Sequence, residues 1–110
     1  MDAVMKNEEI IKRIYEILIE TPYFVCDQCY LRGSYANETY SIVSDIDLLV
    51  VSRDFQDISF RKRNELLQKA MKEFEYKIEI EAICLSNNEY SKLVSEKRDM
   101  YREERMVKIL

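Results

Sequence analysis

Two pairs of acidic residues have the spacing of a metal-binding carboxylate cluster. Asp45 and Asp47 stand one residue apart at the start of a strongly apolar run. Glu79 and Glu81 repeat this spacing in a later run that alternates polar and apolar residues. Residues i and i+2 of a strand point to the same face, with Cα atoms about 6.5 Å apart. Two carboxylates held together are unfavourable unless a cation lies between them, and Mg²⁺ takes oxygen ligands.

If the two acidic strands are neighbours in the sheet, one glutamate completes a three-carboxylate cluster with Asp45 and Asp47. Two ordinary structural interpretations compete with this one. An Asp-x-Asp at the start of a strand also arises when one acid caps a turn and the other is solvated. Glu79 and Glu81 also fit an exposed acidic face of a sheet.

The single glycine of the chain, Gly33, is followed by Ser34 and precedes the first acidic pair. A chain of this length would carry about eight glycines on average. Glycine allows a sharp turn and a close approach of the backbone to a ligand. At the start of a short turn, the amide and hydroxyl of Ser34 would offer hydrogen-bond donors to an anion. Phosphate donors opposite an acidic metal cluster are the apparatus of phosphoryl or nucleotidyl transfer, although Gly-Ser alone is also a plain turn.

The elements that must position these residues follow from the hydrophobic pattern. We expect a helix over residues 3–20 ended by Thr21-Pro22, a strand over 25–31, a strand over 45–52, a helix over 60–75 capped by Ser59, a strand over 76–85, a short helix capped by Ser86 or Asn87, and a small edge strand over 106–110. The second half of the strand 45–52 is apolar enough to be buried on both faces. This order of elements predicts one sheet covered by helices, an α/β or α+β domain.

Composition limits the classes of function. The 110 residues fit one domain, 1–110, with 47% hydrophobic and 35% charged residues. The net charge of −4 disfavours binding to a long nucleic acid, which usually requires a basic surface. It does not disfavour binding to a small triphosphate. No apolar run approaches the roughly 20 residues needed to span a bilayer. The first residues lack the features of a signal peptide, so we expect a cytoplasmic protein without membrane contact.

Three cysteines, Cys26, Cys29 and Cys84, imply no disulfide framework. Cys26 and Cys29 form a CxxC, but in a strand residues three apart point to opposite faces, so these two sulfurs should not meet. Zinc would need further ligands, and the chain has no histidine. We expect the cysteines to act as small buried hydrophobic residues.

The stretch LRGSYANETYSIVSDIDLLVV resembles the minimal nucleotidyltransferases (MNT) of the DNA polymerase β-like nucleotidyltransferase superfamily. Gly-Ser, ten further residues and then Asp-x-Asp form the superfamily signature. The residues in register with it are Gly33, Ser34, Ala36, Ser44, Asp45, Ile46 and Asp47. The later stretch IEAICLSNNEY is similar to the strand that carries the third acid. The resemblance covers about the first 90 residues.

The resemblance implies a small mixed sheet flanked by helices and a specific set of site residues. Asp45, Asp47 and Glu81 would be catalytic and would hold Mg²⁺, two ions in this superfamily, with Glu79 as the alternative third acid. Gly33, Ser34 and Ser44 would bind the nucleotide. The substrate would be ATP or another NTP, whose NMP is transferred to a hydroxyl acceptor.

Two departures from the family pattern bear on activity. Asn37-Glu38 stands where small members often have Arg-Gly, which removes a positive charge from the loop. The third acid is a glutamate, one methylene longer than the more usual aspartate. A nucleotide- or partner-binding module without transfer therefore remains an alternative.

The resemblance also implies a partner. Stand-alone minimal members commonly work beside a HEPN-domain protein as a toxin–antitoxin pair, in which the MNT protein binds or adenylylates the toxin. A second alternative is an adenylyltransferase acting on a small molecule such as an antibiotic, with its acceptor pocket built across a homodimer. Arg61, Lys62 and Arg63 form a dense basic cluster that fits a solvated helix face, with contact to a triphosphate as the other interpretation.

Overall fold

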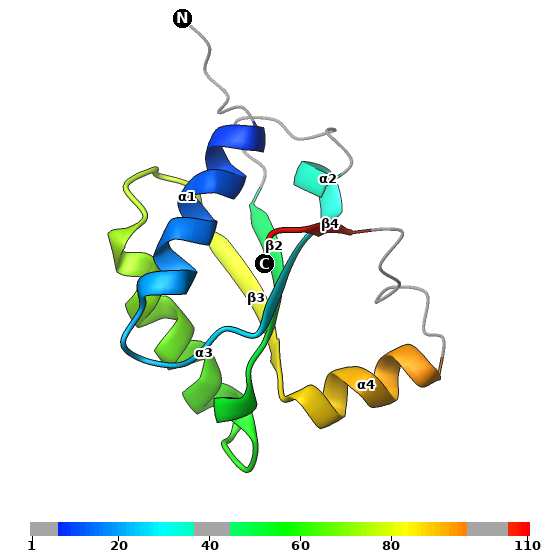
Figure 1. The fold of residues 1–110 in the computed structure, drawn as a ribbon. Helices are drawn as coiled ribbons and strands as arrows, with labels where there is room; N and C mark the ends of the chain where they lie inside the picture. Colours follow the sequence, from blue (N-terminus) through cyan, green and yellow to red (C-terminus); the bar gives the residue numbers. More distant parts are fainter. Residues whose placement is uncertain (1–6, 37–44, 97–105) are drawn as a thin grey trace, which may run out of the picture.

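The computed structural model describes residues 7–36, 45–96 and 106–110, which form a mixed sheet flanked by helices (Figure 1). The elements are α1 (Asn7–Glu20), β1 (Gln28–Arg32), α2 (Gly33–Ala36), β2 (Ile46–Val51), the 3₁₀ turn η1 (Arg53–Phe55), α3 (Phe60–Ala70), the 3₁₀ turn η2 (Met71–Glu73), β3 (Ile80–Leu85), α4 (Asn87–Ser95) and β4 (Val107–Lys108). The strand order is β3-β2-β1-β4. β2 pairs in parallel with β3, whereas β1 pairs antiparallel with both β2 and β4. The predicted fold class is confirmed.

The two faces of the sheet are covered differently. One face packs against α1 and α3, and its buried residues include Cys29, Leu31, Ile46, Leu48, Val50 and Cys84. The opposite face carries a smaller cluster, which is Tyr30, Leu49, Val51 and Leu85 with Tyr90 of α4. α1 and α3 lie on one side of the sheet in Figure 1 and α4 on the other. The smaller cluster does not extend to the start of β2, where Asp47 lies.

The end of α1 and the starts of α3 and α4 are those that the sequence predicts. α1 buries the expected apolar stripe, which includes Ile10, Ile14, Ile17 and Leu18, and ends at Glu20 before Thr21-Pro22. Ser59 caps α3 by accepting a hydrogen bond from the amide of Lys62 at 3.2 Å. Ser86 caps α4 in a capping box with Glu89. The predicted start of the first helix, at residue 3, lies outside the described residues.

Three predicted elements differ from the structure by three or more residues at one end. β1 begins at Gln28 and not at 25, because the amide of Val25 donates to the carboxylate of Asp54 instead of to a neighbouring strand. β3 begins at Ile80 and not at 76, because its partner β2 begins at Ile46. α3 ends at Ala70, where the chain tightens into η2.

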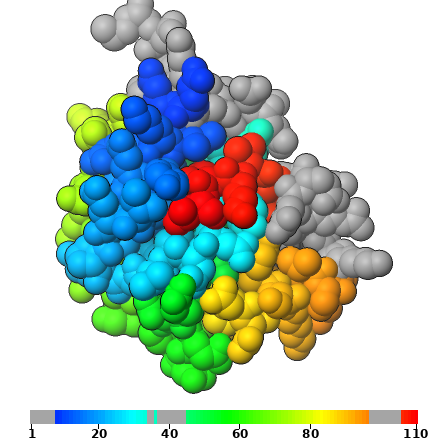
Figure 2. Space-filling view, in the orientation of Figure 1, coloured from blue at the N-terminus to red at the C-terminus, as the bar shows by residue number. Residues whose placement is uncertain are grey.

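The C-terminal residues close the sheet as the predicted edge strand. The amide of Cys29 donates to the carbonyl of Leu110 at 2.9 Å, and the amide of Ile109 donates to the carbonyl of Cys29 at 2.8 Å. In Figure 2 this segment, in red, lies against α1 and β1. None of the helices in the described ranges combines the length and the apolar character that crossing a bilayer requires.

Candidate active site

Asp47 lies at the centre of a row of charged residues that crosses three strands. It pairs in register with Glu81 of β3 on one side and with Arg32 of β1 on the other. Register partners in neighbouring strands project to the same face of a sheet. Asp47 is half-buried and Glu81 is exposed to solvent. The two acidic strands are therefore neighbours, as a shared carboxylate site requires.

Asp45 and Glu79 lie just before the strands that carry the other two acids. Both are exposed. The amide of Ile46 donates to the carbonyl of Glu79 at 2.9 Å, so the two segments meet at this end of the sheet. Within residues 7–36, 45–96 and 106–110, no three Asp, Glu, Cys or His side chains converge closely enough to hold a metal ion. The row thus brings together Asp47 and Glu81, one acid from each pair.

Glu79 borders a different surface from Glu81. It lies at a hollow of about 380 Å³ between the end of α3 and the start of β3, lined by Gln68, Met71, Phe74, Tyr76, Ile78, Glu79 and Ile80. The side-chain amide of Gln68 donates to the carbonyl of Ile80 at 3.1 Å and joins the two walls. Glu81, and not Glu79, is therefore the register partner of Asp47.

Gly33 comes into close contact with Asp47. It is the first residue of α2 and has a φ of +67°, in the left-handed region that favours glycine. A Cβ atom placed on Gly33 would lie 2.6 Å from Oδ2 of Asp47. Ser34 follows in α2, so Gly-Ser does begin a short turn directly after β1. The predicted nucleotide-binding Ser44 and the departure Asn37-Glu38 lie outside the described residues.

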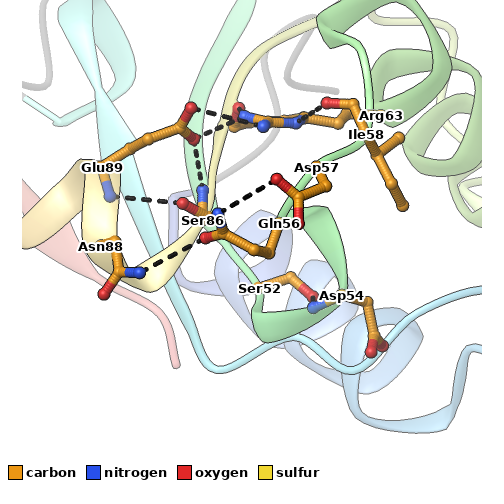
Figure 3. Close-up of polar contacts among 10 residues, drawn as sticks. Ser52, Asp54, Gln56, Asp57, Ile58, Arg63, Ser86, Asn88 and Glu89 are labelled. Carbon is orange, nitrogen blue, oxygen red and sulfur yellow. Dashed lines mark hydrogen bonds and ion pairs between the residues drawn. The ribbon is translucent and has the colours of Figure 1, made fainter.

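Arg63 is the residue that sequence reasoning missed. The prediction of a solvated basic cluster is confirmed for Arg61 and Lys62, which are exposed, but it is wrong for Arg63, which is 4% exposed. Figure 3 shows the guanidinium of Arg63 facing the carboxylate of Glu89 from α4. Its Nη1 lies 2.6 Å from Oε1 of Glu89 and 3.0 Å from the carbonyl oxygen of Cys84. The signal available in the sequence was the Ser86-x-x-Glu89 capping box, which fixes the position of Glu89.

The Arg63 contacts fix the far end of the strand that carries Glu81. Nε of Arg63 donates to the carbonyl of Ile58 at 2.8 Å, and the guanidinium lies 4.4 Å from the centre of the Phe60 ring. One side chain thereby joins the start of α3, the end of β3 and the first turn of α4. Burial raises the pKa of Glu89. The hydrogen bond and charge of Arg63 and the amide of Ser86 together lower it by more, so the net pKa lies below its ordinary value.

The cysteines are packed as small apolar side chains. Cys29 and Cys84 are buried, Cys26 packs against the same cluster, and all three are free thiols. The expectation that Cys26 and Cys29 point to opposite faces is wrong, because Cys26 precedes β1 and the alternation of a strand does not reach it. Burial raises the pKa of Cys26 and of Cys84 to about 12, and that of Cys29 well above its ordinary value. The raised pKa values disfavour the thiolate form that nucleophilic attack and metal binding require.

Comparison with known proteins gives the family. The model of the nucleotidyltransferase domain matches residues 9–108. The chain is similar to the crystal structure of a protein from Sulfolobus solfataricus assigned as a nucleotidyltransferase, with 22% identity, a TM-score of 0.57, and coverage of 82% of this chain and 78% of that one. It is also similar to the crystal structure of a toxin–antitoxin with AMP-PNP, with 21% identity, a TM-score of 0.50, and coverage of 96% and 73%. No curated protein matches the chain. The resemblance carried by Gly33-Ser34 and Asp45-x-Asp47 is thus confirmed at the level of the family, and the chain belongs to the nucleotidyltransferase domain family.

Proposed function

We propose that this protein transfers NMP, most simply AMP from ATP, to a hydroxyl group on a partner protein. Family membership gives the class of reaction, nucleotidyl transfer. The observation that carries the site is the register pairing of Asp47 with Glu81 across two parallel strands. It supports a shared carboxylate site on one face of the sheet, next to the Gly33-Ser34 turn.

The donor chemistry of these residues suits Mg²⁺, and binding would require the three carboxylates to converge further than they do in the described residues. Carboxylate oxygens are the hard donors that this ion prefers, and Asp47 and Glu81 share one face of the sheet with Asp45 at its edge. We assign Asp45, Asp47 and Glu81 as ligands of two Mg²⁺ ions. When bound there, the metal would supply charge neutralisation for the phosphates and would favour ionisation of the attacking hydroxyl.

Gly33, Ser34 and Ser44 are assigned to the phosphates of the NTP. Since Gly33 begins α2, the first amides of this turn are not paired within it, which supports a role in binding an anion. The hydroxyl oxygen of the acceptor attacks the α-phosphorus and forms a new P–O bond. The bond from the α-phosphorus to the bridging oxygen breaks, pyrophosphate leaves with that electron pair, and the hydroxyl proton passes to a carboxylate or to water.

The acceptor is proposed from the structural similarity and the charge of the chain. One similar structure is that of a toxin–antitoxin with AMP-PNP. We infer that this chain, as a single domain over 1–110, is an antitoxin of the MNT kind in the cytoplasm, and that its toxin partner is a HEPN-domain protein. The net charge of −4 suits a protein partner better than a nucleic acid.

The test is transfer of label from α-labelled ATP with Mg²⁺, with and without the purified product of the neighbouring gene. The proposal predicts label on the partner protein, dependent on Mg²⁺ and absent with γ-labelled ATP, because the α-phosphate is the one transferred. An α-label that stays in free nucleotide, with the partner unmodified, would contradict it.

A binding module without transfer is the second candidate. Two observations favour it: Asn37-Glu38 stands where small members often have Arg-Gly, and the described residues contain no converged group of three possible metal ligands. This candidate predicts a stable complex with the partner protein that forms equally well without nucleotide. Mass spectrometry of the partner after incubation with ATP and Mg²⁺ separates the two functions, since transfer of AMP adds a fixed mass to the partner.

A further inference from the structure

Arg32 occupies the basic end of the charged row that contains Asp47 and Glu81. It is the last residue of β1, the register partner of Asp47, and the residue directly before Gly33. Its side chain is half-buried. Because register partners project to one face, Arg32 lies on the same face of the sheet as the two acids. A basic residue is therefore located beside Asp47 and directly before the proposed phosphate-binding turn.

Positive charge is scarce in the stretch of sequence that carries this site. From residue 32 to residue 52, the stretch that holds Gly33-Ser34 and Asp45-x-Asp47, the sequence contains one basic residue, Arg32. The loop after the turn carries Glu38 and neither lysine nor arginine. Lys108 lies on the same face, but its register partner is Tyr30, two residues further along β1. A triphosphate bound at Gly33-Ser34 would find Arg32 as the nearest cation of this stretch.

Arginine can serve a carboxylate and a phosphate together. Its planar guanidinium carries five N–H donors, which form paired hydrogen bonds to either anion and leave donors for a second one. From its position opposite Asp47, Arg32 can contact that carboxylate with one edge and the ligand with the other. A lysine would supply the charge without this geometry.

We propose that Arg32 binds the triphosphate of the NTP and provides the positive charge that Asn37-Glu38 lacks. This inference rests on the proposed function, because it assumes that NTP binds at Gly33-Ser34. A charge-assisted hydrogen bond contributes about 1.5–3 kcal/mol, which corresponds to roughly 10- to 100-fold in affinity.

The test is calorimetric titration of the whole protein with AMP-PNP and Mg²⁺, and separately with AMP, for the wild type, Arg32→Gln and Arg32→Lys. Arg61→Gln is the matched control, because it removes the same charge from a side chain that is 92% exposed and paired with Glu65 on α3. We expect Arg32→Gln to weaken AMP-PNP binding about 10-fold or more and AMP binding less than threefold. Arg32→Lys should fall between the wild type and Arg32→Gln, and Arg61→Gln should match the wild type.

Each of the other possible outcomes overturns a different part of the proposal. Unchanged affinity of Arg32→Gln for AMP-PNP would overturn the role of Arg32 while leaving the proposed function standing. Equal losses for AMP-PNP and AMP would also overturn it, since the contact would not be with the outer phosphates. If the wild type bound no AMP-PNP, the proposed nucleotide site itself would be overturned, and the inference about Arg32 with it. Thermal melting of every variant separates a lost contact from a lost fold.

Discussion

Gly33 and Asp47 approach so closely that a Cβ atom on Gly33 would lie 2.6 Å from Oδ2 of Asp47. The glycine therefore has two functions in the fold: it adopts a φ of +67° and it leaves room for the carboxylate. From the sequence alone, the glycine is explained by a sharp turn or by the close approach of a phosphate to the backbone. The structure adds a reason that applies even without nucleotide, because the Asp47 side chain occupies the space next to Gly33.

Replacing Gly33 should therefore reduce stability as well as nucleotide binding. A side chain in the left-handed region costs about 1–2 kcal/mol, and the new Cβ must displace the Asp47 carboxylate. We expect Gly33→Ala to lower the free energy of unfolding by roughly 1–3 kcal/mol, measured by urea denaturation. Asp57→Gly is the control, since Asp57 has a similar φ of 62° and should change by less than about 1 kcal/mol. A Gly33→Ala protein as stable as the wild type would contradict the structure at this turn.

Arg63 and Glu89 should be strongly coupled in stability. The Arg63 side chain is 5% exposed, and removing Glu89 leaves its charge buried with only carbonyl partners. Breaking a buried pair from one side costs about 3–5 kcal/mol. We expect a cost in that range for Arg63→Ala by urea denaturation, and less than about 0.5 kcal/mol for the exposed Arg61→Ala. A double-mutant cycle with Glu89→Ala that gave additive losses would show that the pair is not coupled.

Acid should destabilise the fold through Asp27 and Glu89. The side-chain hydrogen bond from Arg53 lowers the pKa of Asp27, with further help from the Arg53 amide and from Asn87, and the pKa of Glu89 is also lowered. A folded-state pKa below the unfolded value contributes stability above the unfolded pKa, which is lost as the pH falls through the folded pKa. The free energy of unfolding should be level near neutral pH and fall below about pH 4. Asp27→Asn should flatten that fall; an identical acid profile would contradict the assignment.

The sequence predicted the elements whose signals are local. The apolar run Leu48–Val51 specified the buried strand, and Ser59 and Ser86 marked the helix starts that the structure has. The i, i+2 spacing of the acids and the order of the strands led to the neighbouring positions of Asp47 and Glu81.

What the sequence could not predict depends on contacts between distant segments. Arg63 is buried because Glu89 and the Cys84 carbonyl come to it from more than 20 residues away. Arg32 gains its place opposite Asp47 from the antiparallel register of β1 and β2, which no local pattern specifies. Cys26 joins the core because β1 starts two residues after it, a boundary that depends on the bond from Val25 to Asp54.

The thiols should be unreactive in the folded protein. Burial raises the pKa of Cys26 and Cys84 to about 12, and Cys29 is fully buried, so little thiolate forms near pH 8. We expect Ellman's reagent to label almost no thiol in the native protein at that pH and all three cysteines after denaturation. Rapid labelling of two native thiols would instead indicate an accessible Cys26-x-x-Cys29 pair.

The central claim is that Asp47 and Glu81 act together in nucleotidyl transfer, and the most direct measurement is transfer of α-label to the partner protein by four forms of the chain. These are the wild type, Asp47→Asn, Glu81→Gln and Glu79→Gln, each first shown to be folded by circular dichroism. We predict that Asp47→Asn and Glu81→Gln reduce the rate at least about 100-fold, because each removes a proposed metal ligand. Glu79→Gln, the matched control two residues before Glu81 in the same segment, should stay within about threefold of the wild type. Equal rates for Asp47→Asn and the wild type, or a loss confined to Glu79→Gln, would contradict this site.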